Sequence, residues 1–262
     1  MTASRRVVKR GFLPGLVAAG ALVAFPAFAK EDADVQKRIE ARLAEAKLDQ
    51  GADIQVEVKD GVATLRGITL SLPDRLRAEQ AARKEAKTVE DLVRVFPEKR
   101  KDADIEKDVG TAVLGSVYYG VFDSVGVAVQ DGEVTLRGSV LQPYHKDDIL
   151  ARVVRVPGVR ELKDEVRVQP VSFNDDRLRR ELYRKIYANP NGILMRFAGT
   201  IDPPVRILVE NGHVTLTGYV GTPLEKTVVG NVARGTLAFT VDNQVQLEKD
   251  RRKETTRAAN EG

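Results

Sequence analysis

One eight-residue pattern occurs three times in the chain and constrains its fold more than any other feature. The pattern is Asp/Asn-Gly-x-Val/Ala-Thr-Leu-x-Gly, and it stands at residues 60–67, 131–138 and 211–218. Its opening dipeptide predicts a type I′ turn, because both central positions of that turn need a positive φ. The alternating residues after the turn predict the returning strand of a hairpin. Since internal repeats mark repeated structural units, the sequence predicts three copies of one small unit.

The residues before each turn predict a helix followed by a strand. Apolar residues at i, i+4 and i+8 place one stripe on a helix. These residues are Val35, Ile39 and Leu43, then Ile105, Val109 and Val113, then Leu178, Leu182 and Ile186. Asp34, Asp104 and Asp176 stand at or near the helix starts, where a carboxylate stabilises free backbone N–H groups. Strict alternation then predicts strands at 54–58, 125–129 and 205–209.

The residues after each turn predict a strand, a second helix and a last strand. The returning strand directs its apolar residues to one side, together with the closing glycine of the pattern, where a missing side chain lets a helix approach. Pro73, Pro143 and Pro223 suit the start of the second helix. The sequence therefore predicts an α+β fold of three tandem small α-β-β-α-β domains. Each domain is expected to be a three-stranded mixed sheet with two helices on one face.

The first 29 residues are expected to be an export signal rather than part of the fold. Residues 5–10 include four basic side chains, residues 11–28 are mainly apolar, and Ala27-Phe28-Ala29 resembles a signal peptidase site. These features predict a cleavable signal of the general secretory type and a periplasmic location. A membrane anchor and the twin-arginine route are the alternatives. The domains are then expected at residues 30–98, 101–170 and 172–248, with a disordered tail at 249–262.

The charge of the chain argues against nucleic-acid binding. The sequence holds 42 Lys and Arg against 38 Asp and Glu, and four of the basic residues lie among the first 29, which include no acidic residue. Without that segment the two signs balance at 38 each. No overall basic charge remains to attract a nucleic acid. The chain also has no cysteine, so no disulfide is expected.

No combination of residues typical of an active site occurs in the sequence. The histidines His145 and His213 stand in different units, and a metal site needs more ligands that converge. The acidic pairs Asp147-Asp148 and Asp175-Asp176 are expected at helix starts, where they stabilise the helix rather than transfer protons. No nucleotide-binding or nucleophile motif is present. We therefore expect no catalytic residue, no metal, no cofactor and no enzymatic activity.

The repeated unit resembles the BON domain (bacterial OsmY and nodulation domain). The resemblance rests on the order of elements and on the eight-residue pattern, and it covers about residues 30–248. The second unit also has the family's Gly-Val continuation at Gly158-Val159, where the first has Thr88-Val89 and the third has Leu237-Ala238. The resemblance implies a periplasmic or envelope protein, often induced by osmotic or envelope stress. It also implies binding to phospholipid surfaces or to other proteins, without catalytic residues.

The third unit contains the main candidate for a lipid-binding site. An insertion at residues 189–199 separates its first helix from its first strand, and the helix before the insertion is basic. This combination suits an anionic membrane surface, because cations meet the head groups while apolar side chains enter the interface. The candidate residues are Arg177, Arg179, Arg180, Arg184, Lys185, Ile193, Leu194 and Phe197. As alternatives, the apolar residues extend the core of this unit, dock on the second unit, or contact a protein partner.

A second candidate follows the first helix of the second unit. Residues 117–122 read Val-Tyr-Tyr-Gly-Val-Phe, and two adjacent tyrosines cannot both face a helix core. In related proteins the first helix of a later domain is implicated in phospholipid contact. The resemblance therefore makes Tyr118, Tyr119 and Phe122 secondary lipid-binding candidates. The alternative is that these aromatic rings seal the turn between helix and strand.

The sequence leads to two hypotheses about function. In the first, a non-enzymatic periplasmic envelope protein binds anionic phospholipid surfaces peripherally and supports envelope integrity or osmotic stress tolerance. In the second, the chain is a periplasmic protein-interaction scaffold or chaperone-like module with no lipid role, and its partners are envelope proteins. Vesicle binding distinguishes the two hypotheses.

Overall fold

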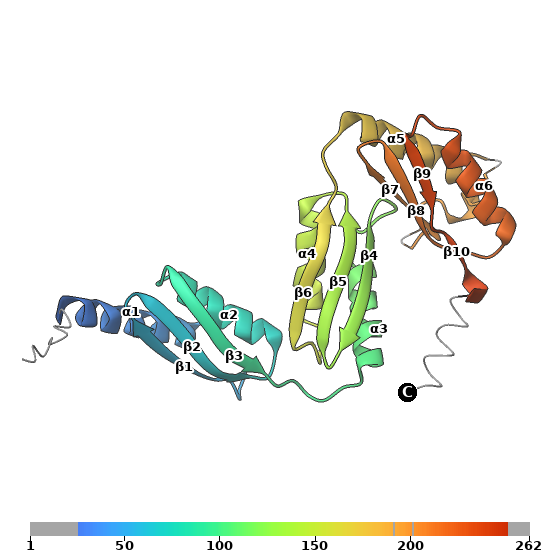
Figure 1. The fold of residues 1–262 in the computed structure, drawn as a ribbon. Coiled ribbons are helices and arrows are strands. Elements are labelled where there is room, and N and C mark those ends of the chain that lie inside the picture. Colours follow the sequence, from blue (N-terminus) through green and yellow to red (C-terminus); the bar gives the residue numbers. More distant parts are fainter. Residues whose placement is uncertain (1–25, 191, 201, 251–262) are drawn as a thin grey trace, which may run out of the picture.

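Three α+β units follow one another along the chain (Figure 1). The computed structural model describes residues 26–190, 192–200 and 202–250. Most of the expected export signal, up to residue 25, lies outside the described residues, and so does the expected tail from residue 251 onward; residues 248–250 are helical. Each unit has its own sheet with two helices, and Figure 1 shows the first and third units at opposite ends of the second.

The first unit has the predicted order of elements. These are α1 (Pro26–Glu45), β1 (Asp53–Lys59), β2 (Val62–Thr69), α2 (Leu72–Arg83) and β3 (Thr88–Val95). The sheet order is β1-β2-β3, with β1 antiparallel and β3 parallel to the central strand. The two helices pack together on one face of the sheet. The core between them includes Ile39, Ala63 and Leu65, which are fully buried as the apolar pattern predicts.

The second unit repeats this arrangement. Its elements are α3 (Asp102–Leu114), β4 (Ser124–Gln130), β5 (Glu133–Val140), α4 (Pro143–Val153) and β6 (Glu161–Val168). The sheet order β4-β5-β6 has the same strand directions as in the first unit. Val109 of α3 and Leu136 of β5 are fully buried between the helices and the sheet. Leu72 and Val95 of the first unit join this hydrophobic cluster, so the first two units are in contact.

The third unit has the same topology with two additional elements, the 3-10 helix η1 and the short strand β10. Its elements are α5 (Phe173–Ile186), the 3-10 helix η1 (Met195–Phe197), β7 (Val205–Glu210), β8 (His213–Val220), α6 (Pro223–Arg234), β9 (Thr240–Asn243) and β10 (Gln246–Leu247). β7 is antiparallel to β8, whereas β9 and β10 both pair parallel with it. The last strand is thus divided into two short ones. The predicted fold class is confirmed in all three units.

A carboxylate in each first helix binds the repeated turn. In the second unit Asp131 and Gly132 have φ of 50° and 74°, as a type I′ turn requires. Their backbone N–H groups donate to the two carboxylate oxygens of Asp102, at 2.7 and 2.9 Å. Asp32 and Asp175 accept the corresponding two bonds in the other units. The turn and the helix are therefore joined in the same way three times.

These carboxylates are not the ones that the sequence pattern indicated. Asp104 and Asp176 lie in the first turns of α3 and α5, as expected. Asp34 does not lie at a helix start, because α1 already begins at Pro26. The bonds to the turns are made by the acidic residue one or two positions earlier in each helix, which points toward the hairpin.

The glycine that closes the pattern is required by the neighbouring strand. Gly138 has a φ of +128°, and a Cβ there would stand 2.0 Å from the carbonyl oxygen of Ser124 on β4. Gly67 and Gly218 have the same relationship to the strands paired with them. The nearest neighbour at this position is therefore the partner strand and not the helix that the sequence led us to expect. Glycine is needed for its positive φ and for the close approach of the partner strand.

Candidate functional site

The segment between α3 and β4 connects the second unit to the third. The carbonyl oxygen of Val121 accepts a hydrogen bond from the N–H of Ile207, at 2.8 Å, so this segment covers the edge strand β7. Phe122 packs against the core of the third unit, and its ring centroid lies 6.3 Å from that of Tyr183. The Gln169 side chain donates to the Phe122 carbonyl at 2.7 Å. The two units therefore have a packed junction.

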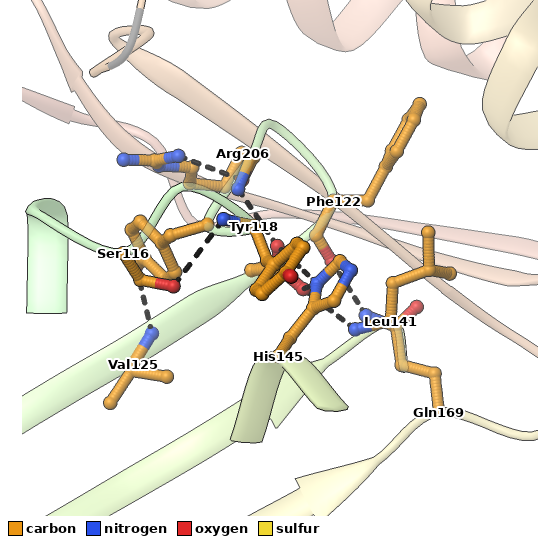
Figure 2. Close-up of polar contacts among 11 residues, drawn as sticks. Ser116, Tyr118, Phe122, Val125, Leu141, His145, Gln169 and Arg206 are labelled. Carbon is orange, nitrogen blue, oxygen red and sulfur yellow. Dashed lines mark hydrogen bonds and ion pairs between the residues drawn. The ribbon is translucent and has the colours of Figure 1, made fainter. Parts of the chain in front are cut away.

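A buried carboxylate fixes the conformation of this segment (Figure 2). Asp123 is fully buried and accepts hydrogen bonds from the N–H groups of Gly120, at 2.8 Å, and Leu141, at 2.6 Å. Nδ1 of His145, at the start of α4, lies 3.0 Å from Asp123 Oδ2. One side chain thus ties the segment both to the end of β5 and to α4, so the junction is held rigidly.

The two adjacent tyrosines point in different directions. Tyr119 is 8% exposed, and its hydroxyl accepts a hydrogen bond from the N–H of Val125 at 3.1 Å. The Arg206 guanidinium lies over its ring, with 4.6 Å from Cζ to the ring centroid. Burial raises the pKa of the Tyr119 hydroxyl, although Arg206 opposes this shift. Tyr118 is 47% exposed and stacks on His145. Tyr119 is therefore a structural residue and its assignment to lipid contact is wrong, whereas Tyr118 faces solvent.

Three arginines form a stripe along α5. Arg177, Arg180 and Arg184 are all exposed, and their i, i+3, i+7 spacing places them on one face of the helix. We call these three residues the arginine stripe. Within residues 26–190, 192–200 and 202–250, no carboxylate lies in ion-pair distance of any of them. The stripe is therefore an uncompensated positive surface.

The other two basic candidates of α5 have partners within the third unit. Arg179 is 2% exposed, and its guanidinium donates to the side chain of Gln169 and to the carbonyl oxygen of Val209. It also pairs with Asp176 at 2.6 Å. A lipid head group cannot reach Arg179, so its assignment to a lipid site is wrong. Lys185 pairs with Glu181 at 2.7 Å.

The apolar residues of the insertion belong to the core of the third unit. Leu194 is fully buried, and Ile193 and Phe197 are partly buried against the same core. Tyr187, also fully buried, donates its hydroxyl hydrogen to the carbonyl of Val205 and accepts from the N–H of that residue. The insertion is therefore fixed to β7, and the alternative of a core extension is correct. Leu194 is wrongly assigned to lipid contact, because no part of it is accessible.

The arginine stripe and the accessible aromatic residues line one pocket. Its volume is about 620 Å³, within the range of roughly 300–1,000 Å³ typical of small-molecule sites. Tyr118, Val121 and Phe122 form its wall on the second unit. Tyr183 and the arginine stripe form the wall on α5. The structure thus brings together residues of the two candidate sites that the sequence places far apart.

The comparison with known families decides what kind of unit is repeated. The BON domain profile matches residues 31–97, 101–170 and 195–249. The chain belongs to the BON domain family. The third match begins at Met195, so α5 with its arginine stripe lies outside the matched part of the third BON domain. BON domains are associated with phospholipid binding and with osmotic stress proteins.

Comparisons with individual proteins add little to this assignment. Two solved structures of CdsD, a structural protein of the type III secretion system of Chlamydia trachomatis, are similar to the chain. The C-terminal domain of CdsD is 15% identical, covers 82% of this chain and 97% of its own, and gives a TM-score of 0.25. The other structure is 15% identical, covers 86% and 98%, and gives a TM-score of 0.24. The comparison with curated proteins gives no match.

The described residues offer neither a metal site nor a membrane-spanning helix. Within the part of the chain that the structure describes, no group of three or more His, Cys, Asp or Glu side chains could hold a metal ion. None of the helices in the same residues is both long enough and apolar enough to span a bilayer. The pocket at the junction combines arginine and aromatic side chains and is the candidate functional site.

Proposed function

We propose that this BON protein binds anionic phospholipid surfaces peripherally, through the arginine stripe of α5, and acts without catalysis. The family association with phospholipid supports the ligand class. The export signal expected in the first 29 residues supports a periplasmic location, where the protein would contribute to envelope integrity or osmotic stress tolerance. The membrane surface would meet the side of the junction where the second and third domains come together.

One observation carries this proposal: among the residues that the structure describes, no acidic side chain pairs with the arginine stripe, although acidic residues share its helix. Glu181 is engaged by Lys185, and Asp176 by the buried Arg179. The acidic side chains of α5 are thus directed away from the stripe. Unpaired arginines on one face attract anionic head groups, and each basic residue near such a surface contributes about 1 kcal/mol. Three of them together favour binding by about two orders of magnitude.

Sedimentation with lipid vesicles tests the proposal. Residues 30–262 are mixed with neutral or anionic vesicles at low and high salt, without the apolar leader that would itself enter the bilayer. We expect binding to anionic vesicles only, weakened by salt because exposed charges are screened. Changing Arg177, Arg180 and Arg184 to Glu should abolish it. The matched control changes three exposed basic residues of the first domain, Lys37, Lys59 and Arg66, to Glu.

The two triple variants lose the same charge, so they separate a local site from a general electrostatic effect. Equal loss of binding in both would show that the arginine stripe is not a site. Full binding by the α5 variant would contradict the proposal, provided that circular dichroism shows native folding.

A protein partner is the second candidate, and one feature favours it. Val171, Phe173, Leu237 and Phe239 are at least 78% exposed, and Leu237 and Phe239 line a pocket together with Ser172 and Asn174, the neighbours of Val171 and Phe173 in sequence. Exposed apolar residues gathered in this way mark interaction surfaces. If an envelope protein binds there, changing Phe173, Leu237 and Phe239 to Ser should abolish its recovery after crosslinking and leave vesicle binding intact. Loss of vesicle binding in this variant would instead assign the apolar residues to the lipid surface.

A further inference from the structure

We propose that the pocket between the second and third BON domains holds one molecule of a single-chain anionic amphiphile. Its phosphate head group would lie on the arginine stripe and its hydrocarbon chain between the aromatic side chains. This inference rests on the proposed function in taking Arg177, Arg180 and Arg184 as the anion-binding residues. It goes further, because adsorption to a membrane surface needs no pocket, whereas a monomeric ligand does.

The wall on the second domain suits a hydrocarbon chain. Tyr118, Val121 and Phe122 face the pocket, and across it stands Tyr183 of α5. Tyr118 remains 47% exposed although its ring contacts those of Tyr144 and His145. Aromatic rings bury large apolar areas and are typical linings of small-molecule sites. A hydrocarbon chain would remove this exposed ring surface from water.

The opposite wall suits an anion. The arginine stripe lines the pocket, and among the described residues that line it Asp123 is the one with a carboxylate. That carboxylate is fully buried and already accepts from the N–H groups of Gly120 and Leu141, with His145 beside it. Its oxygens are therefore directed to these groups of the protein rather than to a ligand. Guanidinium groups bind phosphate oxygens in pairs, so charge complementarity selects a phosphate head group.

The size of the pocket selects one chain rather than two. A volume of about 620 Å³ suits a ligand of drug-like size. One hydrocarbon chain with its head group is of this size, whereas a diacyl lipid is larger. A lysophospholipid or an alkyl phosphate therefore fits the pocket, and alkyl phosphates serve as defined probes.

The pocket is held in shape before any ligand arrives. Asp123 fixes the segment 118–123, and the backbone bond between Val121 and Ile207 fixes the third domain against it. A preformed site binds more tightly, because less conformational entropy is lost on binding. A ligand that touches both domains also stabilises their contact, so it should raise the unfolding temperature of the protein.

Isothermal titration calorimetry of residues 30–262 with octyl, decyl and dodecyl phosphate, each below its critical micelle concentration, tests the proposal. We expect one ligand per chain. Each added methylene should raise the affinity about fourfold until the chain fills the pocket, after which the gain should stop. Dodecylphosphocholine, whose head group has no net charge, and inorganic phosphate, which has no chain, should each bind at least tenfold more weakly than dodecyl phosphate.

One substitution fills the pocket without disturbing its frame. A Cβ at Gly120 would meet only Asp123 Oδ2 and the Tyr118 carbonyl, both at 3.9 Å, so a side chain is tolerated there. We expect Gly120→Leu to weaken dodecyl phosphate binding at least tenfold and to leave vesicle binding unchanged. Gly110→Leu is the matched control, because a Cβ there meets nothing within 4 Å and the residue does not line this pocket. Tyr118→Ala, which removes one exposed wall, is the second variant if Gly120→Leu does not fold.

The outcomes separate this inference from the proposed function. Changing Arg177, Arg180 and Arg184 to Gln should weaken both alkyl phosphate and vesicle binding. If the unmodified protein binds anionic vesicles but no alkyl phosphate, the pocket proposal is overturned and the surface proposal stands. Wild-type affinity in both Gly120→Leu and Tyr118→Ala would also overturn it. Equal binding of dodecyl phosphate and dodecylphosphocholine would show that the arginine stripe does not hold the head group.

Discussion

The guanidinium of Arg206 lies over the ring of Tyr119 and joins the third BON domain to the second. The distance from Arg206 Cζ to the ring centroid is 4.6 Å. Nη1 of Arg206 also donates to the carbonyl oxygen of Gly120 at 2.8 Å, and Nη2 pairs with Asp202 within its own domain. Arg206 is 6% exposed, so its contacts with Tyr119 and Gly120 are shielded from water, whereas the Asp202 side chain is 65% exposed. One side chain of β7 thus holds the segment that forms a wall of the pocket.

Removing this side chain should loosen the junction. Arg206→Ala eliminates a cation–π contact and a charged hydrogen bond, which together contribute about 2 kcal/mol or more. We expect a larger radius of gyration by small-angle X-ray scattering and faster proteolysis between β6 and α5. Arg234→Ala is the control, since the Arg234 side chain contacts Asn231 on its own exposed helix. An unchanged radius of gyration in Arg206→Ala would show that the backbone contacts of the junction suffice.

The repeated fold could be predicted from sequence because its signals are local. The turn pattern fixes each hairpin, and the alternation around it places Leu65, Leu136 and Leu216 in the three cores, where all are fully buried. The division of the last strand into β9 and β10 has no comparable local signal. Between the two short strands the Gln244 N–H still donates to the Leu216 carbonyl oxygen.

The candidate site could be predicted only in part. The arginine stripe was among the predicted residues, but five basic residues on one helix look alike in sequence. The spacing does distinguish Arg179, because it stands at i, i+3, i+7 with the buried Leu182 and Ile186. That one of the two tyrosines faces outward was also predictable. Which one does so depends on Arg206, a residue of another domain.

No pattern in the sequence indicates the pocket itself. Asp123 lies in the segment before β4 and His145 in α4, and their role appears only when this segment and the start of α4 come together. Contacts between domains depend on how complete surfaces fit, and no short pattern encodes that fit.

The carboxylate that binds each turn should contribute more to the free energy of unfolding than the neighbouring carboxylates on the helix. Asp102→Asn replaces one acceptor oxygen by an N–H₂ group, which leaves one turn N–H without a good partner. We expect the free energy of unfolding of the second domain to fall by about 1–3 kcal/mol. Asp104→Asn, in the same first turn, should change it by less than about 0.5 kcal/mol. Urea denaturation and amide hydrogen exchange at Gly132 measure the difference, and equal effects of the two substitutions would contradict this role.

The insertion of the third domain should behave as core and not as a membrane contact. Leu194→Ala removes a fully buried side chain and should destabilise the domain by about 2–5 kcal/mol. Met195→Ala, at a position that is 48% exposed, should change the stability much less. At temperatures below that of unfolding, neither substitution should weaken vesicle binding. A stable Leu194→Ala variant with weakened vesicle binding would return this residue to the lipid site.

Glu225 should make the stability of the third domain depend on pH. Burial alone would raise the pKa of its carboxyl group, but hydrogen bonds from Arg196 and from the Thr222 N–H lower the pKa below its usual value. A carboxyl group whose pKa is lowered by folding stabilises the protein above the pKa of the unfolded chain, about 4.3, and this contribution is lost as the pH falls through the lower pKa of the folded state.

Glu225→Gln keeps the shape and one acceptor oxygen of the side chain but removes its charge. We expect it to lower the free energy of unfolding by roughly 1–2 kcal/mol at pH 7, the difference between charged and neutral hydrogen bonds. The difference from the unmodified protein should close below about pH 4 as the native carboxyl group becomes protonated. Glu181→Gln, which affects an exposed i, i+4 pair with Lys185, should cost only about 0.3–0.5 kcal/mol. Urea denaturation between pH 3 and 7 measures both, and a constant difference for Glu225→Gln over this range would show that the charge of Glu225 does not stabilise the fold.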